Sequence, residues 1–343
     1  MATGARREQY RLPEIALPSL DDLKVQVVSP PPPTADDLIE HLHQRLRAQA
    51  SRRERKPGEP IEAGDDLECD IVTVIDGVVV PGSVKHRAVM EMRELPYLPG
   101  FIEQILQMKT FTAHTFDLVL PDEYPVESLR GKTATFYVEA RRAFQVDQPS
   151  MEDPEALAGA GLGEDIEQAM ETVAKEIDEE QGQQLLIQAA QAVLDAVADR
   201  VEESVPEAAV DEELRQTWQR SDAPVLDGRR FSEDLVEQAL NDFLDDPSLR
   251  AQAAHRIKVG LVLGALVREH NLGPSEEIMT ELLREAASGV GVSYDQAKES
   301  LAEDPLQAQK AAYTALYQTA VEHLMAGAQV EVLEASEFTA ADR

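Results

Sequence analysis

The chain has 343 residues, 43% of them apolar, which is enough to build two domains with hydrophobic cores. Its 65 acidic residues outnumber its 32 Lys and Arg residues, and the net charge of -33 argues against nucleic acid or an anionic membrane as a partner, because phosphate groups would be repelled. The single cysteine, Cys69, excludes an internal disulfide, and the sequence contains neither a secretory signal nor an apolar run long enough to span a membrane. We therefore expect a cytoplasmic protein.

Residues 1–57 are predicted to form an N-terminal arm and linker. Apolar residues alternate over 23–27 as in an extended strand, and the proline run at 30–33 separates this segment from a helix. Thr34 supplies an N-cap, and leucines recur at intervals of four residues along a helix that should end near residue 51. This leucine stripe needs a covering surface.

Basic residues concentrate just after that stripe, between Arg45 and Lys56. A nucleic-acid patch is one interpretation. A solvated helix end, whose cations favour the C-terminal dipole and neutralise nearby acids, is the interpretation that we prefer in so acidic a chain.

Residues 58–148 have the pattern of a small α+β domain. Strand-like runs occupy 67–75, 78–80, 112–120 and 133–140, and Asp76-Gly77 between the first two is a strong hairpin signal. One short helix is expected at 100–108. The domain should be an antiparallel sheet around one helix.

Residues 149–343 are predicted to be an all-α domain. Apolar stripes at helical spacing run from Ile166 to Ile177 and from Leu186 to Val201, and Val205-Pro206 marks a boundary between helices. Further helices follow, one of which should end at the stop signal Asn271-Leu272-Gly273-Pro274. Helices at about 275–288 and 306–325 complete the chain.

Five short motifs occur in order within 58–148 and resemble the isomerase domain of trigger factors, a branch of the FK506-binding-protein (FKBP) fold. They are Asp70, Asp76-Gly77, Leu98-Pro99-Gly100-Phe101, Leu120-Pro121-Asp122-Glu123-Tyr124 and Leu129-Arg130-Gly131-Lys132. The segments on either side resemble the extended arm and the elongated, client-binding helical domain with arms of the same family. The resemblance implies a bacterial folding chaperone.

Trigger factors begin with a ribosome-docking domain that carries a Gly-Phe-Arg-x-Gly-type loop. Only about a dozen residues precede the arm in this sequence, and we find no such loop. Ribosome binding is therefore not expected.

The resemblance also locates a proline-binding pocket. Prolyl isomerisation needs an apolar cradle that favours the twisted amide rather than an acid, base or nucleophile. The matching positions that keep their character are Leu98, Phe101, Tyr124 and Phe136, whereas Ile71, Val80 and Ala88 stand where the family has aromatic residues. The loss of three rings predicts a weak or inactive peptidyl-prolyl isomerase, and the remaining rings could equally be ordinary core residues.

Other candidate chemistry is sparse. His41 and His43 lie two residues apart on a helix and should face different directions, and the acidic clusters at 176–180 and 242–246 lack the spacing of a calcium loop. No metal and no cofactor is expected.

We predict an ATP-independent, trigger-factor-like chaperone that holds unfolded or partly folded client proteins, including chains bound for export or assembly. A single dedicated partner is the narrowest form of this prediction. Flexible and small apolar residues suit such a surface, although most should be packed between helices: Met170, Val193, Val197, Leu261 and Met325. The alternatives are an active peptidyl-prolyl cis-trans isomerase and a structural subunit of a larger assembly.

The arm is expected to lie along the helical domain, away from the adjacent 58–148 domain. Deletion of residues 1–57 should then lower the melting temperature of the helical domain and leave the 58–148 domain nearly unchanged.

Overall fold

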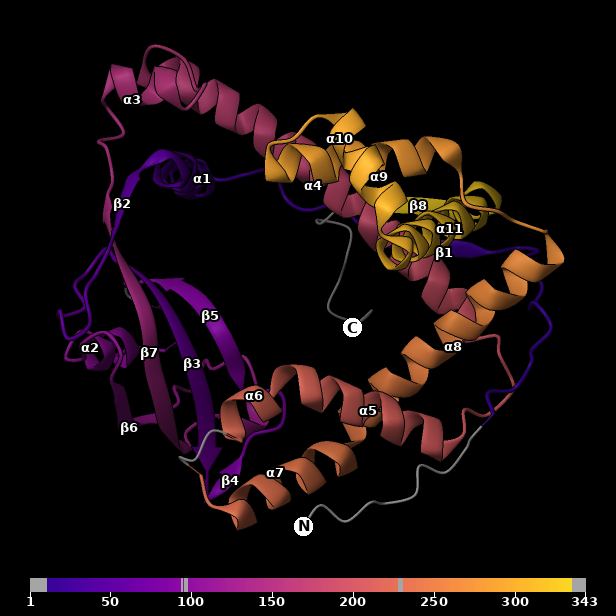
Figure 1. The fold of residues 1–343 in the computed structure, drawn as a ribbon, viewed down its shortest axis with the longest axis horizontal. Coiled ribbons are helices and arrows are strands. Elements are labelled where there is room, and N and C mark those ends of the chain that lie inside the picture. The colour runs from indigo at the N-terminus through magenta and orange to yellow at the C-terminus, as the bar shows by residue number, and fades with distance from the viewer. Residues whose placement is uncertain (1–10, 94, 96–97, 228–230, 335–343) are drawn as a thin grey trace. The chain divides into compact units, whose positions relative to one another are not determined.

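The computed structural model describes residues 11–93, 95, 98–227 and 231–334 (Figure 1). The first ten residues of the expected arm and the last nine of the expected helical domain lie outside this description. The protein is a mixed α/β chain of helices and one antiparallel sheet, with a separate pair of parallel strands. It divides into two compact units. One contains residues 33–177 and 211–251, and the other contains the described residues of 1–32, 178–210 and 252–343.

The antiparallel sheet of the first unit is built around two long strands, β3 (Asp66–Ile75) and β7 (Thr133–Asp147). The strand β7 also pairs with β2 (Ser51–Glu54) and β6 (Ala113–Val119), and β3 also pairs with β4 (Val78–Val79) and β5 (Lys85–Glu91). The predicted Asp76-Gly77 hairpin is confirmed, since both residues have positive φ, 53° and 82°. The strands β2 and β5 were not predicted.

One face of this sheet packs against the short helix α2 (Phe101–Ile105), which is shorter than the predicted 100–108. Alternate residues of β3 point into this core, among them Cys69 and Ile71, while the intervening Asp70 and Val72 face the other side. On that second side Tyr137 contacts Phe231 edge to face, with ring centroids 5.2 Å apart. Both faces of the sheet are therefore covered within the unit.

Helices α5 (Glu207–Ser221), α6 (Ala223–Leu226) and α7 (Glu233–Asp245) follow one another before Pro247. Trp218 of α5 and Phe243 of α7 stack edge to face at 5.4 Å. Trp218, the single tryptophan, is buried in the first unit.

The helix predicted after the proline run is present as α1 (Ala35–Gln49). Thr34 and Asp37 form a reciprocal capping box at its start. Its stripe is covered by α3 (Pro154–Gly159), by the loop after α3 and by the first half of α4 (Ile166–Ala198), in a cluster that includes Leu42, Leu46 and Leu162.

The segment just after α1 differs from the prediction in its pairing and in the burial of two of its arginines. The strand β2 pairs with residues 144–147 of β7, so the expectation that the arm lies away from the 58–148 region is wrong here. Arg47 and Arg55 are only 8% and 5% exposed. The prediction of a solvated helix end is therefore wrong for these two side chains, although they do neutralise acids as expected.

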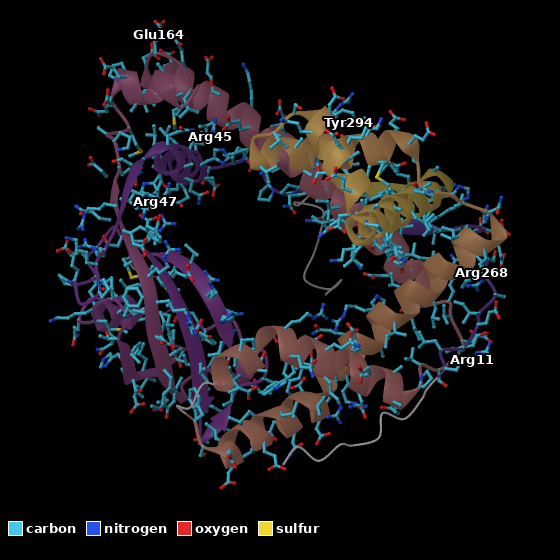
Figure 2. All side chains as sticks on the ribbon, in the orientation of Figure 1. Arg11, Arg45, Arg47, Glu164, Arg268 and Tyr294 are labelled. Carbon is cyan, nitrogen blue, oxygen red and sulfur yellow. The ribbon has the colours of Figure 1, made fainter. Side chains whose placement is uncertain are left out.

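The second unit contains the parallel ladder of β1 (Lys24–Val28) with β8 (Gln329–Leu333). Ile15, Leu23 and Val25 are buried against residues from the second half of α4, from α8 (Pro247–Glu269) and from α11 (Pro305–Gly327). Arg268, labelled in Figure 2, donates from Nη2 to the Ile15 carbonyl at 3.1 Å.

The two predicted stripes at 166–177 and 186–201 belong to one continuous helix of 33 residues, α4. The helices α9 (Glu276–Val290) and α11 match the predicted 275–288 and 306–325, whereas α10 (Tyr294–Glu303) was not predicted. The predicted stop after α8 is confirmed by Asn271 at φ 50° and by a bond from the Leu272 N–H to the Val267 carbonyl at 3.0 Å.

Candidate functional site

The aromatic residues assigned to the proline pocket lie in the core between α2 and the sheet. Phe101 at the start of α2 and Phe136 on β7 pack edge to face, with centroids 5.1 Å apart. Phe116 on β6 completes the cluster at 5.6 Å from Phe101 and 5.7 Å from Phe136. The sequence interpretation missed Phe116, which the alternation of residues along 113–119 could have placed on the inner face.

The other positions assigned to the pocket surround this cluster. Leu98 and Ile71 are buried in the same core, and Val80 and Tyr124 are half-buried against it. Ala88 lies on β5 directly opposite Cys69 of β3. All of the predicted positions except Ala88 thus lie in or against one core cluster.

Burial limits what this cluster can do. Phe101, Phe116 and Phe136 are 2%, 8% and 5% exposed, so their faces contact one another and the surrounding aliphatic side chains. A proline ring needs an aromatic surface that it can reach. Tyr124 is the one aromatic member of the predicted set that retains substantial solvent contact.

A buried carboxylate supports the sheet behind this core. Asp70 is 2% exposed, accepts from Arg141 Nε at 2.7 Å and from the Arg87 N–H at 2.7 Å, and lies 3.1 Å from His86 Nδ1. Burial by itself would raise the pKa of Asp70, but the bonds from Arg141 and from the Arg87 backbone outweigh burial and hold that pKa below its usual value. Asp70 is therefore an ionised structural anchor.

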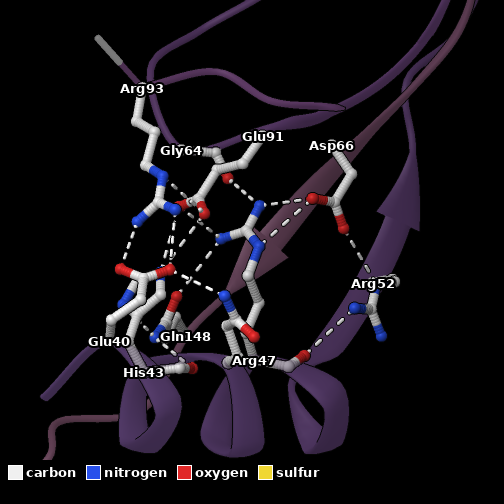
Figure 3. A network of polar contacts seen from close by, with 10 residues as sticks. Glu40, His43, Arg47, Arg52, Gly64, Asp66, Glu91, Arg93 and Gln148 are labelled. Atoms are coloured by element: carbon white, nitrogen blue, oxygen red, sulfur yellow. Dashed lines mark hydrogen bonds and ion pairs between the residues drawn. The ribbon is translucent and has the colours of Figure 1, made fainter. Parts of the chain in front are cut away.

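A second polar cluster joins α1 to the sheet (Figure 3). Arg47 donates from Nη2 to Asp66 Oδ1 at 2.6 Å and to the Gly64 carbonyl at 2.7 Å, and its Nη1 lies 3.2 Å from Glu91 Oε1. Gln148, after the end of β7, accepts from Arg47 at 3.2 Å. Four segments far apart in sequence therefore meet at one guanidinium group, which we call the Arg47 network.

The periphery of the Arg47 network is also paired. Arg93 binds Glu40 of α1 through two bonds of 2.6 and 2.7 Å. Hydrogen bonding from Arg93 lowers the pKa of Glu40 to about 2, so this carboxylate is ionised at neutral pH. These contacts hold α1 against the sheet.

Large apolar side chains are exposed in both units, among them Val89 and Phe111 in the first. In the second unit they include Leu186 and Ile187 on α4, Val290 on α9, Val292 after it, Leu306, Tyr313 and Tyr317 on α11, and Val332 on β8. Tyr313 is 74% exposed and Val290 72%. Single exposed apolar residues are common on soluble proteins, and it is a contiguous patch of them that marks a binding surface.

The residues that the sequence suggested for an adaptable surface are packed, as was expected for most of them. Val193 and Val197 are fully buried, and Leu261 and Met325 pack against the same core. Met170 packs against the cluster around α1.

A groove of about 250 Å³ lies between α9 and α11. Its apolar side chains are Ile278, Leu282, Tyr317 and Val321. Carboxylates stand beside them at three positions, Glu281, Glu285 and Glu322. The groove thus combines a narrow apolar floor with negative charge.

Among the described residues no group of three or more His, Cys, Asp or Glu side chains is arranged to hold a metal ion. His41 and His43 contact different carboxylates, Glu176 at 3.0 Å and Glu91 at 3.2 Å. Across the described ranges, no helix combines the length and the apolar character that a membrane crossing requires.

The helical part of the chain matches a known protein family. Residues 165–326 match the family described as "Bacterial trigger factor protein (TF) C-terminus". A solved trigger factor chaperone covers 90% of this chain at 17% identity with a TM-score of 0.34, a likeness too weak to support an argument.

Curated relatives extend the match beyond the helices. Trigger factors from Granulibacter bethesdensis, Gluconacetobacter diazotrophicus and Hydrogenovibrio crunogenus are 29%, 28% and 27% identical to this chain and cover 81%, 80% and 87% of it. The chain in turn spans 61%, 61% and 66% of their lengths.

A helical region of the trigger factor type is combined with an antiparallel α+β region in this chain. Residues 165–326 belong to the trigger factor C-terminal family, and the chain as a whole is similar to trigger factors.

Proposed function

We propose that this protein is an ATP-independent chaperone whose helical surface holds unfolded or partly folded client chains. The observation that carries the proposal is the set of exposed apolar residues on α4, α9 and α11, which are accessible to the apolar side chains of an unfolded client. Dispersed contacts of this kind favour binding of many sequences over tight binding of one.

The acidic composition supports the same function. A net charge of -33 keeps a complex with an aggregation-prone client apart from other complexes. The same charge disfavours contact with ribosomal RNA, so we propose that clients are captured in free solution in the cytoplasm.

Suppression of aggregation tests this proposal. The full chain without nucleotide should keep a chemically denatured client soluble on dilution, and the double variant Tyr313→Ser with Tyr317→Ser should do so less well. The matched control is Gln309→Ser, which changes an exposed polar residue of α11. Equal protection by the double variant and the control would reject the assignment of this surface.

The client range is a separate part of the proposal. We propose that the set of clients bound in the cell is narrower than the set that the surface can accept, down to one partner destined for export or assembly, because a chaperone free in solution does not meet every new chain. Recovery of one stoichiometric protein with the native chaperone would support a dedicated partner or a subunit role, whereas a heterogeneous pool would support general capture.

We also propose that residues 58–148, together with β2, form an FKBP-like domain with little isomerase activity, flanked by the arm in 1–57 and the helical domain in 149–343. The burial of Phe101, Phe116 and Phe136 supports low activity. Acceleration of proline-limited refolding to the level of an active isomerase would overturn it.

A further inference from the structure

Two histidines meet at the end of α8 and on α11, at positions that the proposed function does not use. His323 Nε2 lies 3.1 Å from His270 Nδ1, and the two ring centroids are 4.5 Å apart at an interplanar angle of 62°. Both residues are exposed. Two ring nitrogens at this distance share one hydrogen bond when one of them carries the proton.

The backbone holds both histidines in fixed places. His270 follows the last residue of α8, and its N–H donates to the Leu266 carbonyl at 3.0 Å. Asn271 then ends the helix in the left-handed region. On α11, His323 directly precedes Leu324, which is buried in the same core as Leu266. The pair thus lies at the edge of a packed contact between two long helices.

The spacing of the two nitrogens matches that of ligands on one metal ion. Imidazole nitrogens lie about 2.1 Å from a bound transition metal, so two of them are about 3.0 Å apart at a right angle and about 3.4 Å apart at the tetrahedral angle. The observed 3.1 Å falls between these values. The nitrogens need only lose the shared proton and turn their lone pairs toward one point.

The charge around the pair also favours a cation. The carbonyl groups at the C-terminal end of α8 carry partial negative charge. Glu269 and Glu322 are the sequence neighbours of the two histidines, and Glu269 already accepts from the Leu17 N–H at 2.8 Å.

We propose that His270 and His323 form a two-ligand site for a divalent transition-metal ion that prefers imidazole, such as Cu²⁺, Ni²⁺ or Zn²⁺. Water fills the remaining coordination positions, because no third ligand of the described residues joins the pair. The bound ion links the end of α8 to α11. Hard cations that prefer oxygen ligands, such as Mg²⁺, do not bind there.

Calorimetric titration of tag-free, full-length protein with Ni²⁺ tests the site. One ion should bind per chain, and His270→Ala and His323→Ala should each weaken binding about tenfold or more, because each removes one of two protein ligands. With Cu²⁺, electron paramagnetic resonance should show coupling to two imidazole nitrogens, reduced to one in either variant.

His255→Ala is the matched control, since His255 is a histidine of α8 that lies 2.7 Å from the Asp195 carboxylate. It should bind Ni²⁺ as the unmodified protein does. Because His270 and His323 are exposed, their variants should keep the far-ultraviolet circular dichroism spectrum of the parent. Absence of Ni²⁺ binding at millimolar concentration, or binding of unchanged affinity in either single variant, would overturn the proposal.

Discussion

Substitution of Arg47 by alanine should weaken the first compact unit substantially. The change removes donors from Asp66 at 2.6 Å, from the Gly64 carbonyl at 2.7 Å and from Glu91 at 3.2 Å. Arg47 is 8% exposed, so the carboxylates it leaves behind are mostly shielded from water. Removal of one partner from a buried ion pair costs about 3–5 kcal/mol.

Two remaining contacts reduce that figure. Asp66 keeps Arg52 at 3.2 Å, and Glu91 keeps His43 at 3.2 Å. We therefore expect Arg47→Ala to lower the free energy of unfolding by about 2–4 kcal/mol. With a urea dependence of about 2–3 kcal/mol per molar, the unfolding midpoint should fall by about 1 M.

Trp218 fluorescence during urea unfolding is the appropriate assay, because Trp218 is buried in the same compact unit as Arg47. The control is Arg53→Ala, which removes an ion pair with Glu59 whose arginine side chain is 51% exposed. Addition of Asp66→Asn to Arg47→Ala should recover part of the loss, because it removes a carboxylate that has lost one of its two arginine partners. If Arg47→Ala shifts the midpoint no more than Arg53→Ala, the Arg47 network does not hold α1 to the sheet.

Three further predictions concern the sheet and its core. Phe136→Ala should cost about 3–5 kcal/mol by leaving a cavity, measurable by the same urea assay, whereas an open pocket at this position would make the loss small. The pKa of Asp70 is lowered in the folded state, so its contribution to stability is present above the ordinary carboxyl pKa and is lost as the pH falls through the folded value. Asp70→Asn should accordingly reduce the slope of stability against pH in the acid range below the ordinary carboxyl pKa; an unchanged slope would contradict this role. Burial, aided by the neighbouring Asp70 and Glu68, raises the pKa of the Cys69 thiol to about 12, so alkylation should require unfolding, and rapid labelling of the native protein would contradict the burial of this side chain.

Local signals in the sequence predicted local structure well. Thr34 and Asp37 lie three residues apart and form the capping box that starts α1. Asp76-Gly77 forms the hairpin turn, and Asn271 ends α8. In each case the residues that specify the conformation are the residues that adopt it.

Non-local pairing is what the sequence did not reveal. The strand β2 reads Ser-Arg-Arg-Glu and is exposed along its length, so it carries no apolar alternation, and only its pairing with β7 makes it a strand. Arg47 looked like one cation in a basic cluster, because its acidic partners lie 19 and 44 residues farther along the chain. The helix α10 has no buried residue, so its sequence has no apolar stripe from which the helix could be predicted.

The exposure of the aromatic residues differs between the region proposed for prolyl isomerase activity and the region proposed for client binding. In the sheet region Phe101, Phe116 and Phe136 are buried in one cluster, so their apolar area stabilises the fold and is removed from any ligand. On α11, by contrast, Tyr313 and Tyr317 are 74% and 44% exposed, and packing of the helix depends on Ala315, Ala320 and Leu324 instead. The tyrosines therefore add little to the stability of the helix that carries them, and a loss of client binding without a loss of stability in their serine variants would identify them as contact residues.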